Sequence, residues 1–221
     1  MATTRRVTRV AALTGVCLAM SCATWRGRVS PALEAAAEHG DPLAVADALE
    51  ALIAEGDDTP ADREYAYTAV TRDDEDTAAY AFARATVTGR LVQQRGLLAA
   101  NLVGEVEDWA LRSIELDPSF REGAAARLLG TLWVLAPASL VKRGDSERGL
   151  ELLTTLVRDH PDQVENHLRL AEAYIALHDP APAEPHLCVC LAERTVLRHD
   201  EQRLLDQLVR VAGAPRCPTG P

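Results

Sequence analysis

The regular alternation of amphipathic segments with short turn signals is the feature that most constrains this chain. Between turns, apolar residues recur every three or four positions, as at Val164, Leu168, Ala171 and Tyr174. This period places them on one face of an α-helix. The separating turn signals are Gly40-Asp41-Pro42, Gly56-Asp57-Asp58, Asp117-Pro118, Gly144-Asp145, His160-Pro161-Asp162, His178-Asp179-Pro180 and Gly213-Ala214-Pro215. Because β-branched residues are thin beyond the N-terminus and aromatics make up only 4%, the sequence predicts an all-α fold.

The helical segments fall into pairs with the spacing of an internal repeat. One tetratricopeptide-like unit has Leu170, Ala171, Tyr174, Ala183, Leu187 and Cys190 at the required positions, and the preceding unit has Leu129, Gly130, Trp133, Gly149, Leu153 and Leu156. A small residue such as Gly130 or Ala171 lets the second helix of a pair approach closely, while Trp133 or Tyr174 fills the space between units. We therefore predict antiparallel helix pairs stacked as a tetratricopeptide-like α-solenoid.

The repeats define the expected domain boundaries. We expect one helical-repeat domain over 30–221, with its clearest repeats at 121–161 and 163–194 and a closing helix at 197–211. Pro180, Pro182 and Pro185 crowd the start of the last repeat's second helix. Proline is tolerated only in the first turn of a helix, so this helix could begin as late as Pro185 and leave Ala183 outside.

The N-terminus has the pattern of a lipoprotein signal peptide over 1–21. Three arginines precede a short apolar run that ends in Leu18-Ala19-Met20-Ser21-Cys22. A small residue directly before a cysteine resembles the bacterial lipobox, although Met20 occupies a place where a small residue is usual. We expect Cys22 to carry the lipid and 22–29 to form a tether. The alternatives are ordinary cleavage near Ala23 and an uncleaved anchor.

The charge of the chain bears on its partners. Its 23 basic and 33 acidic side chains give a formal net charge of −10. Nucleic acids are held largely by basic side chains that displace counterions, so we expect no nucleic-acid partner. The expected location is the cell envelope, with a lipid anchor in the outer membrane and the body facing the periplasm.

The segment 121–177 resembles a known family. Its Arg-x-Leu-Gly, aromatic, Ala-Pro, Gly-Asp and Asn-His-x-x-x-Ala order is similar to the T-component lipoproteins of TRAP transporters. The matching residues are Arg127, Gly130, Trp133, Ala136, Pro137, Gly144, Asp145, Pro161, Asn166, Ala171 and Tyr174. The resemblance implies a helical periplasmic lipoprotein whose partners are a periplasmic solute receptor or an apolar, organic-acid ligand. No ligand-binding residues can be transferred from the family.

Signatures of catalysis are missing from the sequence. It contains no GxxxxGK[ST], GxSxG or HExxH motif, and Lys142 is its single lysine. We therefore predict a non-enzymatic binding scaffold without cofactor or metal. The alternatives are an envelope-assembly scaffold and, less favoured, a hydrolase or transferase on a helical frame. The sequence also leaves a homo-oligomer possible.

Two polar clusters have a functional and a structural interpretation. The acidic run 73–76 could hold a hard cation, but it lacks the EF-hand pattern and reads better as a solvated loop. His186, Cys188 and Cys190 could bind zinc, or a cysteine could pair with Cys217, but we favour core cysteines. His160 and His167 flank a helix junction and are expected to be caps or interface groups rather than acid–base catalysts.

The loop 137–144 is the predicted binding element. Insertions in stacked repeats project on one face, which is often the binding face. The loop carries Leu140 and Val141 beside Lys142 and Arg143 in an otherwise acidic chain, a combination suited to an amphipathic anion. The alternative is that the two apolar residues pack under their own repeat while the two cations balance local acids.

Overall fold

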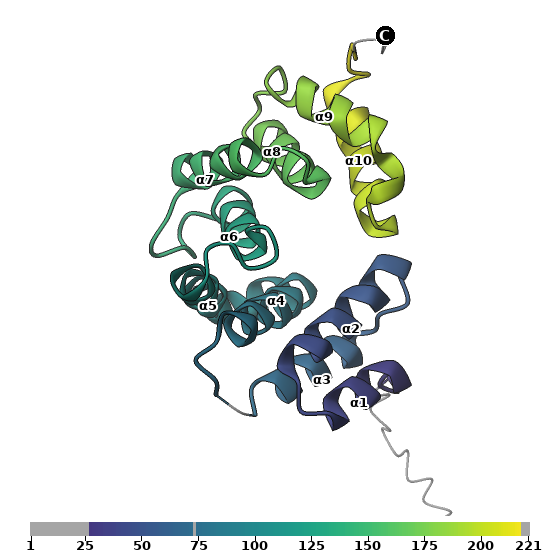
Figure 1. Ribbon diagram of the computed structural model, residues 1–221, viewed down its shortest axis with the longest axis vertical. Coiled ribbons are helices and arrows are strands. Elements are labelled where there is room, and N and C mark those ends of the chain that lie inside the picture. The colour runs from purple at the N-terminus through teal and green to yellow at the C-terminus, as the bar shows by residue number, and fades with distance from the viewer. Residues whose placement is uncertain (1–26, 73, 218–221) are drawn as a thin grey trace, which may run out of the picture.

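The computed structural model describes residues 27–72 and 74–217, and within them all regular structure is helical (Figure 1). The signal peptide, Cys22, most of the tether and Asp73 lie outside the described residues. The α-helices are α1 (Pro31–Glu38), α2 (Pro42–Glu55), α3 (Pro60–Val70), α4 (Ala78–Arg95), α5 (Val103–Leu116), α6 (Ala124–Leu135), α7 (Ser146–Asp159), α8 (Val164–Ala176), α9 (Ala183–Ala192) and α10 (His199–Ala212). Two 3-10 helices, η1 (Gly96–Leu102) and η2 (Arg194–Val196), join α4 to α5 and α9 to α10.

Helix ends follow from local capping chemistry. The Asp41 side chain accepts hydrogen bonds from Leu43 N and Ala44 N, and α2 ends at Gly56, whose φ of 82° is left-handed. Asp145 caps α7 in the same way through Arg148 N at 2.9 Å. Asp41 and Asp145, which lie in two of the turn signals of the sequence, are thus the N-caps of the helices that follow.

The start of α9 differs from the expectation that it could begin as late as Pro185. The helix begins at Ala183, which is fully buried, so Ala183 lies inside the helix and not before it. Pro185 is then the third residue of α9. The first four backbone amides of a helix have no partner within it, so a proline in this turn removes no helical hydrogen bond.

The last helix also begins later than expected. Residues 194–196 form η2, and α10 runs from His199 to Ala212 rather than over 197–211. Leu197, expected as its first apolar residue, precedes the helix and is still buried in the cluster formed by α8, α9 and α10. The amphipathic pattern of this segment therefore marks burial correctly but not the first helical turn.

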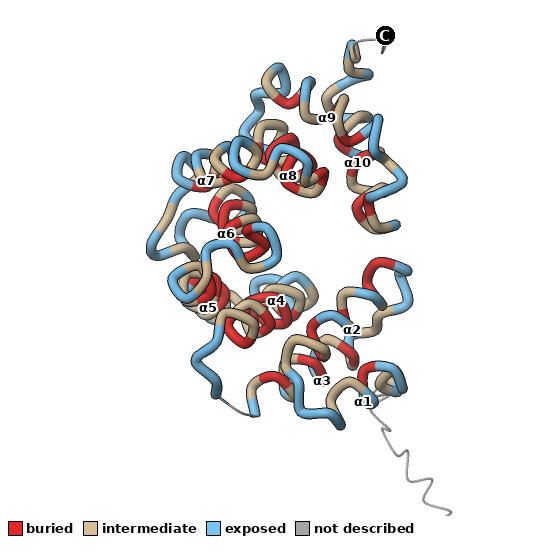
Figure 2. Tube along the Cα trace, in the orientation of Figure 1, coloured by how far each residue is buried: buried red, intermediate tan, exposed pale blue. Residues whose placement is uncertain are grey.

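The even-numbered helices form a closed cycle. Helix α2 packs on α4, α4 on α6, α6 on α8, α8 on α10, and α10 returns to α2. Helices α5 and α7 lie on the outer side of this ring, each packed on its two even-numbered neighbours (Figure 1). Buried stretches recur in each helix from α1 to α10, whereas the linkers are mostly exposed (Figure 2). We call the side of α2, α4, α6, α8 and α10 that faces the middle of the cycle the ring interior.

Close packing positions the helices of the ring. A Cβ atom at Gly130 on α6 would lie 2.8 Å from Leu153 Cγ, and one at Gly149 on α7 would lie 2.7 Å from the Gly130 carbonyl oxygen. These distances are shorter than ordinary van der Waals contact. The α6–α7 pair can therefore adopt this separation only because both positions are glycine. Helix α8 continues the packing with Leu170 and Ala171, which are buried.

Within the described residues, no helix is both long enough and apolar enough to cross a bilayer.

Candidate binding site in the ring interior

Charged side chains from three different helices meet in the ring interior. Glu50 on α2 accepts a hydrogen bond from Arg90 Nη2 on α4 at 2.6 Å and one from Arg198 Nη1 at 3.0 Å. Arg198, the N-cap of α10, also donates to Asp200 Oδ2 at 3.1 Å. This Glu50 network joins α2 and α4 to the start of α10.

Burial sets the electrostatics of this network. Burial alone would raise the pKa of Glu50, but hydrogen bonds and charge from Arg90 and Arg198 hold that pKa below its usual value. Burial likewise opposes the charge of Arg90, and Glu50 raises its pKa nonetheless. The three groups therefore stay charged inside the protein because each supplies the partner that the others need.

Arg127 on α6 is the exception in the ring interior. Its Nη1 donates to Asn166 Oδ1 on α8 at 2.8 Å. Among the described residues no carboxylate lies within ion-pair distance of this guanidinium. Burial lowers its pKa, and the charges that act on it come from Glu165 and Arg169 on α8 and from Arg198 and Glu201 at α10. Arg127 is therefore a partly buried cation between α6 and α8 that has no ion-pair partner among the described residues.

Several buried polar atoms of the described residues lack a hydrogen-bond partner. Asn166 is fully buried, and its Nδ2 donates to no described atom. Arg198 Nε, Asp200 Oδ1 and Gln94 Oε1 are also buried without a hydrogen bond. Buried polar groups are satisfied in more than nine cases of ten, so each of these exceptions needs an explanation such as an ordered water or a ligand.

The structure gives the loop 137–144 a different setting. Glu107 on α5, which is completely buried, accepts hydrogen bonds from Trp133 Nε1 at 2.9 Å, Lys142 N at 3.0 Å and Arg143 N at 2.7 Å. A Cβ at Gly144 would overlap the Trp133 ring, so the loop crosses this ring at a glycine. Glu107 thus holds the loop to α5 and α6, on the outer side of the ring.

The four predicted binding residues of this loop do not share one environment. Val141 packs against the apolar cluster that contains Leu129 and Trp133, and Leu140 is half-buried. Arg143 pairs with Asp108 at 2.7 Å, and Lys142 is exposed. This arrangement has the features of the alternative in which the apolar residues pack under their own repeat and the cations balance local acids.

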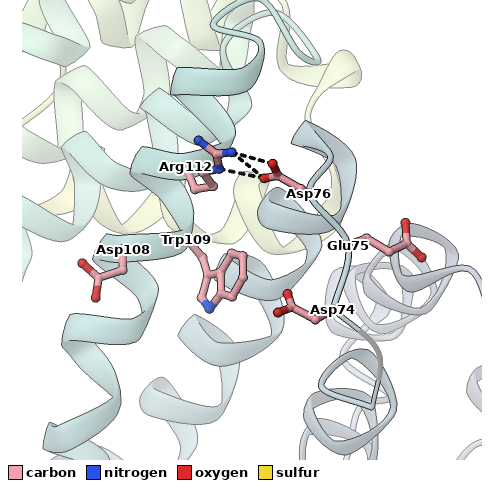
Figure 3. A pocket seen from close by; sticks show the side chains of 6 residues that line it. All are labelled: Asp74, Glu75, Asp76, Asp108, Trp109 and Arg112. Atoms are coloured by element: carbon pink, nitrogen blue, oxygen red, sulfur yellow. Dashed lines mark hydrogen bonds and ion pairs between the residues drawn. The ribbon is translucent and has the colours of Figure 1, made fainter.

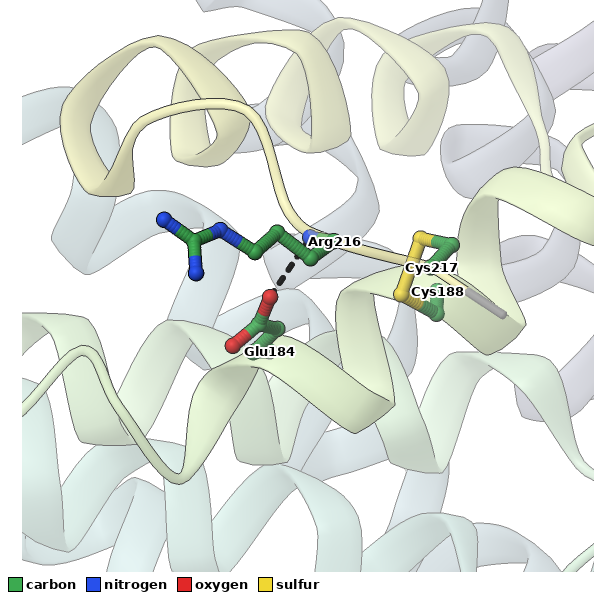
Figure 4. The surroundings of a disulfide bond; sticks show 4 residues. All are labelled: Glu184, Cys188, Arg216 and Cys217. Atoms are coloured by element: carbon green, nitrogen blue, oxygen red, sulfur yellow. Dashed lines mark hydrogen bonds between the residues drawn. A yellow bond between two sulfur atoms is a disulfide. The ribbon is translucent and has the colours of Figure 1, made fainter. Parts of the chain in front are cut away.

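The cysteines of α9 differ from the favoured expectation. Cys190 is buried and free, as a core cysteine should be. Cys188 is not a core thiol but forms a disulfide with Cys217, which attaches the C-terminal segment to α9 (Figure 4). Arg216 N donates to Glu184 Oε1 beside this bond. The expectation of core cysteines is therefore wrong for Cys188, because the segment after α10 turns back along α9 and brings Cys217 to it.

His186 has a histidine partner instead of a cysteine. His167 Nε2 lies 2.9 Å from the Pro161 carbonyl oxygen, which can only accept, so this nitrogen carries the proton. His167 Nδ1 then accepts from His186 Nδ1, also at 2.9 Å. Burial, followed by the effect of His167, lowers the pKa of His186 to about 4. The pair with Tyr174 stacked on it is a neutral contact between α8 and α9, and sequence reasoning missed it because the two histidines are 19 residues apart.

The acidic segment borders an open pocket of about 410 Å³ beside α5 (Figure 3). Arg112 forms a bidentate contact with Asp76, while Glu75 points away from Trp109. The carboxylates thus do not converge on one point. In the part of the chain that the structure describes, no group of three or more His, Cys, Asp or Glu residues is placed to hold a metal ion.

Comparison with known proteins adds no assignment, since the sequence matches no protein-family profile and no curated protein.

Proposed function

We propose that this chain is a non-enzymatic scaffold lipoprotein of the cell envelope that binds a small organic acid inside a closed tetratricopeptide-like solenoid. In this proposal the lipid on Cys22 holds the body at the outer membrane, facing the periplasm. The protein would serve as an accessory of a TRAP-type solute transporter, with a periplasmic solute receptor as its protein partner.

One observation carries the binding role. The partly buried Arg127 guanidinium lies against the fully buried Asn166 amide, Arg127 has no ion-pair partner among the described residues, and Asn166 Nδ2 has no hydrogen-bond partner. An isolated buried charge costs several kcal/mol, so a chain that only needed a stable core gains nothing from this arrangement. If the scaffold binds an anion here, the anion supplies the missing charge and explains why the Arg127–Asn166 arrangement is present.

The disulfide supports the location. Disulfides persist in oxidising compartments such as the periplasm and are rare in the cytosol. The pairing of Cys188 with Cys217 is therefore the arrangement expected of an exported chain.

Analysis of the protein purified from its native membrane tests the proposal in two independent parts. Mass spectrometry of the N-terminal peptide should show acyl groups on Cys22, and an N-terminus at Ala23 or an unmodified Met1 would contradict the anchor. Small molecules released by denaturing the same sample should include an organic acid in stoichiometric amount. Release of none after gentle purification would contradict solute binding.

A further inference from the structure

Two adjacent leucines differ from the other exposed side chains of the body. Leu97 and Leu98, in η1, are 82% and 90% exposed, more than any other large apolar side chain of the described residues. Ala99 and Val103 next to them are buried, so this segment packs on the body through other residues and presents the two leucines outward. Single exposed leucines are ordinary on a protein surface, whereas adjacent ones form an apolar patch that points to contact with a membrane or a partner.

The end of the body that carries η1 also carries the start of α3. The 3-10 helix begins directly after α4, and the last turns of α4 lie beside the first turns of α3. Arg95 Nη2 donates to Glu64 Oε1 at 2.9 Å, and Arg63 Nη1 donates to the Arg90 carbonyl oxygen at 3.1 Å. The leucines of η1 and the first turn of α3 are therefore at the same end of the body.

The chain enters the body at this end as well. A Cβ at Gly27, the first described residue, would lie 3.7 Å from Ala61 Cβ, and Ser30 N donates to Asp62 Oδ1 at 2.7 Å. Cys22 precedes Gly27 by five residues. An extended chain spans at most about 3.5 Å per residue, so a lipid on Cys22 holds the start of α3 within about 18 Å of the bilayer. The end with the exposed leucines is then the end next to the membrane.

Basic side chains lie at the same end of an otherwise acidic chain. Arg28 and Lys142 are both exposed. Lys142 lies over the start of α5, because a Cβ at Gly104, the second residue of that helix, would be 3.1 Å from Lys142 Nζ. Anionic headgroups attract cations over about one Debye length, so these two side chains reduce the repulsion that a net charge of −10 produces at a membrane.

We propose that Leu97 and Leu98 form a second membrane contact, which inserts into the interfacial region of the bilayer that holds the lipid anchor. The inference rests on the proposed function for the lipid on Cys22 and adds to it the orientation of the body. The leucines supply the apolar contact, and Arg28 and Lys142 lie at the level of the headgroups. Two attachments fix the ring against the bilayer, whereas a lipid on a tether alone lets the body rotate.

Photo-crosslinking of the full-length chain tests this contact. A benzophenone amino acid replaces Leu98, and the protein purified from its native membrane is reconstituted in vesicles of phosphatidylethanolamine and phosphatidylglycerol. After illumination, mass spectrometry should find a lipid adduct on the peptide that contains position 98. The control carries the same group in place of Leu116, at the other end of the 14-residue helix α5 and so roughly 20 Å away, and it should give no lipid adduct.

Two substitutions test whether the leucines themselves enter the bilayer. Leu97→Asp places a carboxylate beside position 98 and should lower the yield of the lipid adduct several-fold, because a charged group is unfavourable outside water. Val211→Asp makes the same kind of change at a residue near the end of α10 that is 67% exposed, and it should leave the yield unchanged. Both positions are exposed, so both variants should keep the wild-type melting temperature.

The mass of the N-terminal peptide in the same sample separates this inference from the proposed function. A lipid adduct at position 98 with an unacylated Cys22 would support the leucine contact and contradict the anchor. An acylated Cys22 without a lipid adduct at position 98 would overturn the contact and leave the proposed function in place. A crosslink between two copies of the chain instead of one to lipid, or equal lipid adducts at positions 98 and 116, would also overturn the contact.

Discussion

Two neighbouring parts of helix α6 differ in what they pack against: one makes a close apolar contact with α7, and the other carries a charged side chain. At the contact, Gly130 and Gly149 bring two backbones together over Leu153 with no polar side chain between them. Three residues before Gly130, on a neighbouring part of the same helix side, Arg127 is partly buried and hydrogen-bonds to α8 without an ion-paired carboxylate. Helix α6 therefore combines a close apolar contact with α7 and a charged contact with α8.

This difference separates residues that stabilise the fold from residues whose role lies outside folding. Apolar contacts tolerate little change in volume, so their residues report on stability. Unpaired buried charge is unfavourable for stability, and its presence points to a role outside folding. The Glu50 network lies between these cases, because it is charged but internally balanced.

Removing the shared carboxylate of the Glu50 network should have the largest effect on the free energy of unfolding. Glu50→Gln leaves the partly buried Arg90 and Arg198 without their shared carboxylate, so the free energy of unfolding should fall by about 1–3 kcal/mol, less than for a fully buried pair. Urea unfolding followed by circular dichroism measures this change. The matched control is Glu64→Gln, which breaks the exposed pair with Arg95 and should cost less than about 0.5 kcal/mol. Equal effects in the two variants would show that the ring interior is not a buried charged region.

Overpacking the apolar face should have the next largest effect. Gly130→Leu places a side chain where Leu153 and the Gly149 backbone already lie, so we expect a loss of about 1–3 kcal/mol in thermal unfolding. Ala171→Leu on buried α8 should act in the same direction. Ala51→Leu adds the same side chain at an exposed position of α2 and should leave the melting temperature nearly unchanged. A fully tolerated Gly130→Leu would contradict the close α6–α7 packing.

Acid should weaken the α8–α9 contact by a smaller amount. The pKa of His186 is about 4 in the folded protein and 6.5 when unperturbed, so the unfolded chain binds a proton first as the pH falls. The stability from the neutral pair is complete above pH 6.5 and is lost between pH 6.5 and about 4. Because His186 is half-buried, we expect a loss of about 1 kcal/mol rather than the full linkage value. His186→Asn should flatten this part of the stability–pH curve, and an unchanged slope would contradict the neutral pair.

The loop on the outer side of the ring should show the smallest effect on folding. Changing Lys142 and Arg143 to Ser removes exposed charges while Glu107 still holds the loop backbone, so stability should change by less than about 0.5 kcal/mol. If the loop lies beside a partner, the double variant should capture a solute receptor less well, most clearly at low salt. Capture with the same yield and salt dependence as the wild type would make the loop a connector only.

Local chemistry predicts much of the fold. Asp41 and Asp145 start helices because their side chains cap the first turn, and period-3.6 patterns locate α7 and α8. The start of α9 is missed because proline is acceptable in a first turn at more than one register. The sequence alone also does not reveal that α10 returns to α2, since that contact joins residues about 150 positions apart in the chain.

The candidate site is less accessible to sequence reasoning. Arg127 and Asn166 are noticed in the sequence only as members of a family-like segment, because their significance depends on the absence of a nearby carboxylate. Glu107 and the histidine pair are missed for a similar reason, since each acts through partners on other helices. The loop 137–144 is conspicuous by its composition, but its Val141 packs against the apolar cluster of Leu129 and Trp133.

Anomalous diffraction from crystals soaked in bromoacetate tests the central claim most directly, because bromine reports where a small carboxylate rests. The account predicts a bromine peak in the ring interior, with the carboxylate against the Arg127 guanidinium and the Asn166 amide, and no such peak in Asn166→Asp crystals. Bromine found only on the outer surface, with water beside Arg127, would contradict it.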